Sequence, residues 1–152
     1  MNVSVVIPCY NEEDVLPESY RRFTQVMSST SYEYELLFVN DGSKDRTESL
    51  LLSFAEQDKH VKVLSFSRNF GHQNAVTAGL QHCSGDITVI IDADLQDPPE
   101  VIPQMIETYL REKSNVVYAV RNKREGESFG KLLTAKAVSY THLRAHETRG
   151  NL

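Results

Sequence analysis

The sequence has few of the features that mark secreted, membrane-spanning or metal-clustering proteins. It holds only two cysteines, Cys9 and Cys83, which lie far apart and match no metal-binding or redox spacing. No apolar run approaches the roughly 18–20 residues that span a bilayer, and residues 2–8 are too short for the apolar core of a signal peptide. We therefore expect a cytoplasmic protein with both cysteines reduced.

Basic residues are too few for a nucleic-acid-binding face. The 16 lysines and arginines are outnumbered by 21 aspartates and glutamates, so the formal net charge is −5. Because no basic run offsets this charge, we expect no nucleic-acid partner. The 152 residues, of which 40% are hydrophobic and 24% charged, suffice for one ordinary globular domain.

Five short segments rich in β-branched or other apolar residues alternate with segments whose apolar residues recur at helical spacing. Strands are predicted at residues 3–9, 34–39, 61–66, 87–91 and 115–120, and helices at about 13–27, 45–57, 73–83 and 99–113. This alternation predicts an α/β fold with a mostly parallel sheet and helices on both faces. Residues 126–138 are expected to form one more helix, whereas residues 139–152 have no sustained apolar face and are expected to lie outside the domain.

Polar residues follow each predicted strand. These clusters are Tyr10-Asn11-Glu12, Asp41-Gly42-Ser43, Arg68-Asn69, Asp92-Ala93-Asp94 and Arg121. Because the carboxyl ends of parallel strands share one edge of the sheet, we expect the clusters to converge there, where ligands of open α/β sheets bind.

Asp92 and Asp94 are the most informative pair. They follow the strand at residues 87–91, and Pro98 and Pro99 prevent that strand from continuing. An unpaired carboxylate in the core is costly, so both are expected at the strand's carboxyl end. Two such hard oxygen ligands suit Mg²⁺ or Mn²⁺ carrying a substrate's phosphates. The alternative is a solvated acidic turn that leads into a helix with proline at its first position.

Taken together, the motifs resemble the N-terminal part of a family-two inverting glycosyltransferase with a GT-A fold. Within that family the sequence is most similar to polyprenyl-phosphate sugar transferases. The resemblance covers about residues 3–138 and is carried by residues 5–13, 39–47, 67–73, 92–100 and 121–128. It implies a Rossmann-like nucleotide-sugar-binding domain at residues 1–138 that is truncated at its C-terminus. In the family, acceptor-side elements and membrane-associated helices usually follow, so membrane contact is expected only through that missing part, at the cytoplasmic face.

The resemblance also implies roles for individual residues. Nucleotide-binding residues would be Pro8, Tyr10, Asn11, Glu12, Asp41, Arg68 and Asp92. The metal and diphosphate site would consist of Asp92, Asp94 and Gln96, and the catalytic residues would be Asp94, Arg121 and Arg124. Taken singly, these residues also fit structural roles in turns and at helix starts. His72 is expected to cap a helix, with a contact to donor or acceptor as the alternative.

The implied reaction moves a sugar from a nucleotide-sugar, here a UDP-sugar, to polyprenyl phosphate with inversion and with Mg²⁺ or Mn²⁺. A lipid phosphate has a second pKa of about 6 and is largely anionic at neutral pH, so arginines that hold it matter more than a base. Guanidinium groups match phosphate in a fork. The alternatives are a nucleotidyltransferase and a non-catalytic Mg²⁺-binding α/β module. A nucleotidyltransferase would usually have a glycine-rich, basic phosphate loop near the first strand, but residues 8–12 are acidic.

Overall fold

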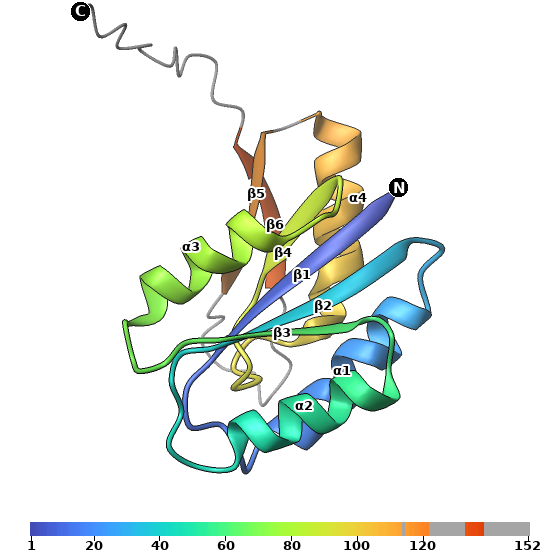
Figure 1. Ribbon diagram of the computed structural model, residues 1–152. Coiled ribbons are helices and arrows are strands. Elements are labelled where there is room, and N and C mark those ends of the chain that lie inside the picture. Colours follow the sequence, from blue (N-terminus) through green and yellow to red (C-terminus); the bar gives the residue numbers. More distant parts are fainter. Residues whose placement is uncertain (114, 122–132, 139–152) are drawn as a thin grey trace, which may run out of the picture. The chain divides into compact units, whose positions relative to one another are not determined.

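The computed structural model describes residues 1–113, 115–121 and 133–138 (Figure 1). The chain divides into two compact units, Met1–Pro103 and Gln104–Leu152. Within the described residues, no helix is both long and apolar enough to cross a membrane. The predicted tail at residues 139–152 lies outside the described residues.

The first unit is built on a four-stranded parallel sheet. Its strands are β1 (Asn2–Cys9), β2 (Glu33–Asn40), β3 (Val61–Ser65) and β4 (Ile87–Ile90), arranged in the order β3-β2-β1-β4. The central strand β1 is buried from its second residue onwards. Continuous apolar strands of this kind are typical of parallel sheets that are covered on both faces.

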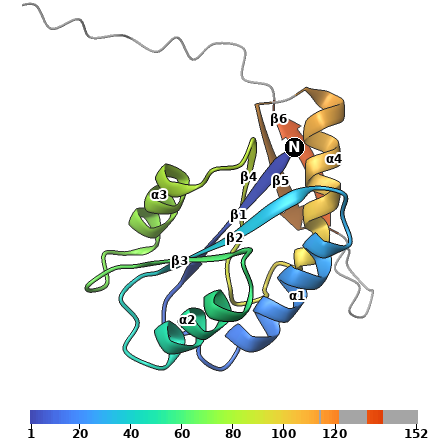
Figure 2. The same ribbon diagram turned by 45° about the vertical axis from the view of Figure 1, so that its right-hand side comes forward.

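Helices cover both faces of this sheet, as predicted. They are α1 (Leu16–Ser28), α2 (Thr47–Gln57) and α3 (His72–His82). Figures 1 and 2 show α3 on one face and α1 with α2 on the other. Val6, Val39 and Ala75 form the buried cluster under α3. Val5, Ile7 and other fully buried neighbours in β1 and β2 point to the opposite face, because side chains alternate along a strand.

The polar segments after β1 to β4 meet at one edge of the sheet, as the sequence predicts. Parallel pairing continues up to the strand ends, where Cys9 is aligned with Asn40 and Asn40 with Ser65. Backbone hydrogen bonds extend the ladder beyond the strands, since the amide of Asp41 donates to the carbonyl of Cys9 (2.9 Å) and the amide of Ile91 to that of Val6 (3.1 Å). The carboxyl ends of all four strands therefore form a single edge.

The last predicted elements differ from the structure. After the short 3-10 helix η1 (Pro99–Val101) and helix α4 (Ile102–Glu112), strand β5 (Val116–Arg121) pairs antiparallel with β6 (Leu133–Val138). The strand predicted at residues 115–120 is therefore present, but its predicted place as a fifth parallel strand is wrong, because among the described residues β5 pairs with β6 and not with the four-stranded sheet.

The predicted helix at residues 126–138 is also wrong where it can be compared. Residues 133–138 form β6, and residues 122–132 lie outside the described residues. The segment from Leu133 to Ala137 alternates apolar and polar residues with Thr134 and Lys136 between them. This period of two suits a strand, and the backbone ladder with β5 outweighs the helical spacing that the longer window suggests.

Candidate functional site

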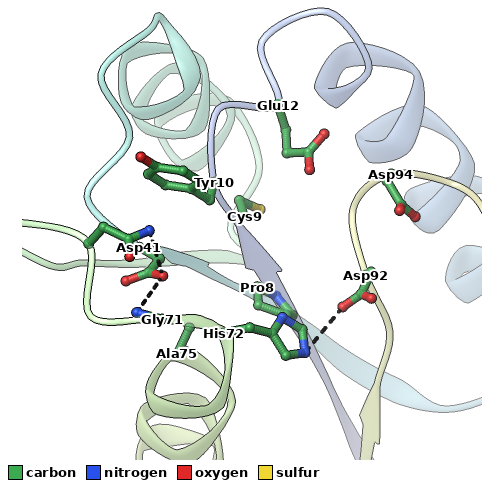
Figure 3. Close-up of a pocket in the computed structure, with 11 residues that line it drawn as sticks. Pro8, Cys9, Tyr10, Glu12, Asp41, Gly71, His72, Ala75, Asp92 and Asp94 are labelled. Atoms are coloured by element: carbon green, nitrogen blue, oxygen red, sulfur yellow. Dashed lines mark hydrogen bonds and ion pairs between the residues drawn. The ribbon is translucent and has the colours of Figure 1, made fainter.

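A pocket opens at the carboxyl-terminal edge of the parallel sheet (Figure 3). Its volume is about 220 Å³, somewhat below the roughly 300–1,000 Å³ that small-molecule sites typically occupy. The lining residues are Pro8, Cys9, Tyr10, Glu12, Asp41, Asn69, Gly71, His72, Ala75, Asp92 and Asp94. Since ligands of open α/β sheets bind at this edge, the pocket is the candidate site.

The structure brings together most of the predicted donor-side residues. Those that line the pocket are Pro8, Tyr10, Glu12, Asp41, Asp92 and Asp94. Asn11, Arg68 and Gln96 are not among the lining residues. Arg121 ends β5 in the second unit with only its backbone described, and Arg124 lies outside the described residues. The roles assigned to all these residues stay predictions.

The segments that follow β1 and β2 are joined to each other by hydrogen bonds. The amide of Asn11 donates to Ser43 Oγ (3.0 Å), the amide of Glu12 donates to Thr47 Oγ1 (2.8 Å), and the Lys44 amide donates to Asn11 Oδ1 (2.8 Å). Asn11 has a φ of 53°, in the left-handed region that asparagine tolerates better than most residues. Asn11 therefore shapes the loop that presents the neighbouring Tyr10 and Glu12 to the pocket.

Asp41 ties the segment after β2 to the segment after β3. Its carboxylate is buried and accepts hydrogen bonds from the amides of Phe70 (2.7 Å) and Gly71 (3.0 Å) and from Asn69 Nδ2 (3.1 Å). Gly42 has a φ of 66°, and a Cβ there would lie 2.2 Å from the carbonyl carbon of Arg68. The two backbones can approach this closely only at a glycine. Three of the roughly four acceptor positions of the Asp41 carboxylate therefore hold the neighbouring loop.

Negative charge accumulates in the pocket. Glu12, Asp92 and Asp94 all face it (Figure 3), and no lysine or arginine is among its described lining residues. Burial raises the pKa of Glu12 above its ordinary value, and the charges of Asp94, Asp45 and Asp92 raise it further. Among the described residues, the one ion pair that involves these carboxylates joins His72 Nε2 to Asp92 Oδ1 at 3.7 Å. This imbalance favours a bound cation.

The carboxylates fit a cation that is shared with a ligand better than one held by protein alone. Among the described residues, no three His, Cys, Asp or Glu side chains are arranged to hold a metal ion. Asp94 Oδ1 accepts the amide of Gln96 (2.9 Å), so the backbone of Gln96 orients this carboxylate. Mg²⁺ is usually bound by one or two carboxylates together with water and substrate phosphates. Asp92 and Asp94 match that donor set.

His72 does not cap helix α3, contrary to the prediction. The N-cap residue is Gly71, with no capping bond from a side chain and a φ of 96°. Because Asp41 holds the Gly71 amide, the helix starts beside the pocket, and His72 at the first helical position faces Asp92 (Figure 3). The alternative that the sequence left open, a side chain directed towards a ligand, agrees with this position.

Other lining residues had no role assigned from the sequence. Burial raises the pKa of the Cys9 thiol, and nearby Glu12 and Asp92 raise it further, so this thiol stays neutral. Asn69 and Gly71 lie in the polar segment after β3, and that position is the signal that could have identified them. Arg68 was predicted to bind nucleotide, but its guanidinium lies over the Phe70 ring, 4.5 Å from the centroid.

Comparisons with known proteins agree with the geometry of the site. The family model described as glycosyl transferase family 2 matches residues 4–152. The uncharacterized glycosyltransferase YkcC of Bacillus subtilis (strain 168) is 56% identical over 132 residues, which are 87% of this chain and 41% of the relative. The bactoprenol glucosyl transferase of Shigella phage SfV is 44% identical over 136 residues, 90% of this chain and 44% of the relative.

One similar solved structure contains a nucleotide and a metal ion. It is glucosyl-3-phosphoglycerate synthase from Mycobacterium tuberculosis in complex with Mn²⁺, uridine diphosphate and glucosyl-3-phosphoglycerate. The match has a TM-score of 0.56 and 27% identity, and it covers 72% of this chain and 39% of that one. The chain therefore spans less than half the length of each of these three proteins.

Proposed function

The chain belongs to glycosyl transferase family 2, and we propose that its pocket binds the nucleoside diphosphate part of a UDP-sugar together with Mg²⁺ or Mn²⁺. The observation that carries the proposal is the group of Glu12, Asp92 and Asp94 in a pocket lined by no lysine or arginine among the described residues. A diphosphate would add further negative charge, so a divalent cation is needed to join the two. The similar synthase from Mycobacterium tuberculosis was solved with uridine diphosphate and Mn²⁺.

In this proposal the carboxylates of Asp92 and Asp94 hold the cation. A bound divalent ion neutralises charge on a leaving diphosphate. Pro8, Tyr10 and Glu12 surround the base and the ribose, with the partly exposed Tyr10 ring offering a surface for stacking. Asp41 keeps the loop with Asn69 and Gly71 against the pocket and leaves about one acceptor position for the base.

The acceptor that we propose is polyprenyl phosphate, and the sugar is transferred with inversion. Support comes from the likeness to the bactoprenol glucosyl transferase of Shigella phage SfV. A phosphate acceptor is already anionic at neutral pH, which agrees with a site that needs cationic groups rather than a base at the acceptor. Arg121 and Arg124 are proposed for that role. The cytoplasmic location stays a prediction.

The donor site is tested by calorimetric titration of UDP into the protein with Mn²⁺ present. We expect binding that needs Mn²⁺ and that weakens at least tenfold, or about 1.4 kcal/mol, in Asp92→Asn and in Asp94→Asn. The matched control is Asp14→Asn, which removes an exposed carboxylate outside the pocket lining and should bind UDP like the unmodified chain. A folded protein that binds no UDP, or binds it equally well without metal, would contradict the proposal.

A further inference from the structure

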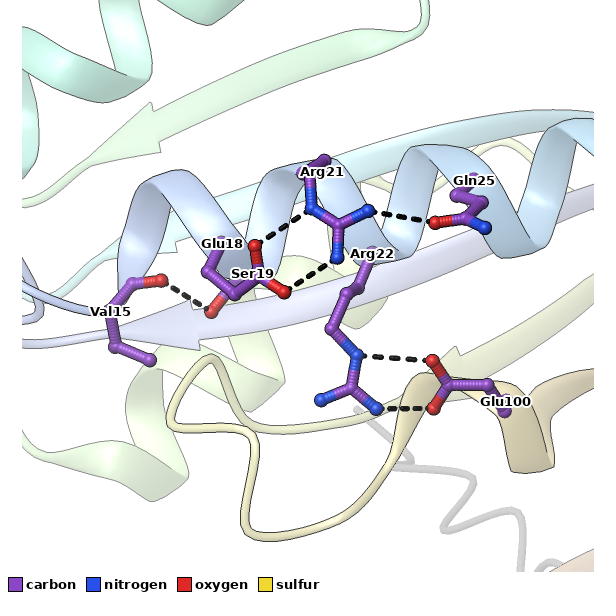
Figure 4. A network of polar contacts seen from close by, with 7 residues as sticks. All are labelled: Val15, Glu18, Ser19, Arg21, Arg22, Gln25 and Glu100. Carbon is purple, nitrogen blue, oxygen red and sulfur yellow. Dashed lines mark hydrogen bonds and ion pairs between the residues drawn. The ribbon is translucent and has the colours of Figure 1, made fainter.

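Helix α1 contacts the loop that carries Asp92 and Asp94. Ser19 of α1 is fully buried, and its hydroxyl oxygen lies 2.5 Å from the carbonyl oxygen of Ala93, the residue between the two aspartates. The same hydroxyl lies 3.1 Å from the carbonyl oxygen of Val15 in its own helix (Figure 4). A hydroxyl has a single proton to donate, and the shorter distance indicates that Ala93 receives it.

Arg22 of the same helix contacts the chain beyond the loop. Its guanidinium forms a two-pronged ion pair with Glu100 in η1, with Nε 3.0 Å from Oε1 and a second, shorter bond to Oε2 (Figure 4). These hydrogen bonds lower the pKa of the Glu100 carboxyl, which therefore stays ionised. Paired, parallel bonds of this kind fix direction as well as distance. The loop is thus held by α1 at Ala93 and at Glu100.

Two features of the loop between these contacts favour a different conformation. Leu95 has a φ of 58°, a left-handed conformation that is unfavourable for a residue with a side chain. The carboxylates of Asp92 and Asp94 also face the same pocket as Glu12, whose pKa is raised by burial and then by the charges of both aspartates. Without outside support, the loop could lower its energy by moving the aspartates apart.

We propose that Ser19 and Arg22 are positioning residues that hold Asp92 and Asp94 in the arrangement needed to bind a divalent cation. Ser19 fixes the backbone between the two aspartates, and Arg22 anchors the far end of their loop. The proposal rests on the proposed role of the pair as a cation site. Supporting groups of this kind commonly change metal affinity roughly 10–100-fold when removed.

The first test compares Mn²⁺ affinity in Ser19→Ala and in Ser28→Ala in the presence of saturating UDP, measured from the free Mn²⁺ signal in electron paramagnetic resonance. Within the described part of the chain, the Ser28 hydroxyl donates to the carbonyl of Gln25 in its own helix (3.2 Å), so its removal controls for the loss of a helix hydroxyl. We expect the Mn²⁺ dissociation constant to rise about tenfold in Ser19→Ala and to stay unchanged in Ser28→Ala. Equal affinities in the two variants would overturn the role of Ser19.

Arg22→Ala provides a second variant in case Ser19→Ala does not fold. Its matched control is Arg21→Ala, because the side-chain hydrogen bonds of Arg21 to Glu18 and Gln25 stay inside α1 (Figure 4) and only its charge acts on Glu100 among the described residues of the loop. We expect weaker Mn²⁺ binding in Arg22→Ala alone, with partial recovery in Arg22→Lys, which keeps one of the two bonds. Equal Mn²⁺ affinity in Arg22→Ala and Arg21→Ala would overturn the role of Arg22.

A measurement without metal separates failure of this proposal from failure of the proposed function. Amide hydrogen exchange at residues 93–97 should be faster in Ser19→Ala than in Ser28→Ala, while exchange in β2 stays the same. Faster exchange in a protein that binds no Mn²⁺ even with UDP present would support the positioning role and contradict the cation site. Unchanged exchange with unchanged Mn²⁺ affinity would overturn the positioning role and leave the cation site intact.

Discussion

Asp41 shows how one side chain connects two walls of the pocket. Its carboxylate accepts from Asn69, Phe70 and Gly71, which lie in the segment after β3, while its own backbone continues the ladder with Cys9. A carboxylate is needed because every neighbour is a donor. An amide of the same shape would place an NH₂ group against one of these N–H groups.

Asp41→Asn is therefore expected to destabilise the protein by about 1–3 kcal/mol, the usual cost of leaving a buried donor unsatisfied. The same variant should weaken UDP binding, because the loop that carries Asn69 and His72 loses its anchor. Urea unfolding and calorimetry measure the two effects, with Asp14→Asn as the exposed control. Stability within about 0.5 kcal/mol of the unmodified protein would argue against this account of the carboxylate.

Glu35 of β2 forms a second buried polar group, near the opposite end of the sheet. Its carboxylate accepts from Ser4 Oγ, from the amide (2.7 Å) and hydroxyl (2.9 Å) of Ser84, and pairs with Lys62 Nζ at 2.5 Å. Burial by itself raises the pKa of Glu35, but the bonds from Lys62, Ser4 and Ser84 outweigh burial and lower the pKa from 4.5 to about 2.

The depressed pKa of Glu35 predicts a pH dependence of stability. Glu35 takes up its proton near pH 4.5 in the unfolded chain and only near pH 2 in the folded protein. The contribution of Glu35 to the free energy of unfolding is therefore fully present above pH 4.5 and is lost as the pH falls towards 2. We expect a loss of about 2–3 kcal/mol, reduced by solvent because Lys62 is half exposed.

Urea unfolding between pH 2.5 and 6 measures this effect. Glu35→Gln should be less stable at neutral pH and should lose most of this acid dependence. Glu33→Gln changes an exposed glutamate of the same strand and should keep the full dependence. A similar pH profile in both variants would show that the acid sensitivity arises elsewhere.

At the level of elements, the packing of α3 against the sheet depends on one residue without a side chain. A Cβ at Gly79 would lie 2.3 Å from Val6 Cγ1 and 3.2 Å from Val39 Cγ2. Helix α3 can therefore lie directly on β1 and β2, and its first residue, His72, reaches the pocket. A bulkier residue would move the helix away from the strands that it covers.

Gly79→Ala is expected to lower the free energy of unfolding by about 1–2 kcal/mol. Overpacking costs about 1–3 kcal/mol and outweighs the helix propensity of alanine, which favours the substitution by about 1 kcal/mol. Val6→Ala removes the methyl groups that a Cβ at residue 79 would meet, so Gly79→Ala should lower the free energy of unfolding by less in that background. A double-mutant cycle by urea unfolding measures the coupling, and additive effects would contradict direct contact between these two side chains.

The elements that the sequence predicts best are those whose ends are marked by polar or turn-forming residues. The segments of β1 to β4 are apolar, several of them β-branched, and they end at polar clusters. The helices between them have clear apolar spacing, so the type and order of these elements follow from local pattern. Gly79 illustrates what could not be predicted, because a lone glycine in a helical pattern does not say which strand it faces. The strand β6 was missed because short apolar runs do not reveal a partner that lies elsewhere in the chain.

For the molecule as a whole, the convergence of strand ends predicted the place of the pocket but not how its walls are held. The contacts that hold the walls join residues distant in sequence. They are the bonds of loop amides to Ser43 and Thr47, the bonds of residues 69–71 to Asp41, and the contact of Ser19 with Ala93. Periodicity carries no information on such contacts. The predicted role of Arg121 at this edge also depended on a fifth parallel strand that the described residues do not contain.

We propose above that a divalent cation completes the acidic pocket by joining Asp92 and Asp94 to a nucleoside diphosphate. The most direct test is anomalous diffraction at the manganese absorption edge from crystals grown with UDP and Mn²⁺. The account predicts one strong anomalous peak within bonding distance of both carboxylates and of the diphosphate oxygens. A peak at another place, or UDP bound in the pocket with no manganese beside these aspartates, would contradict it.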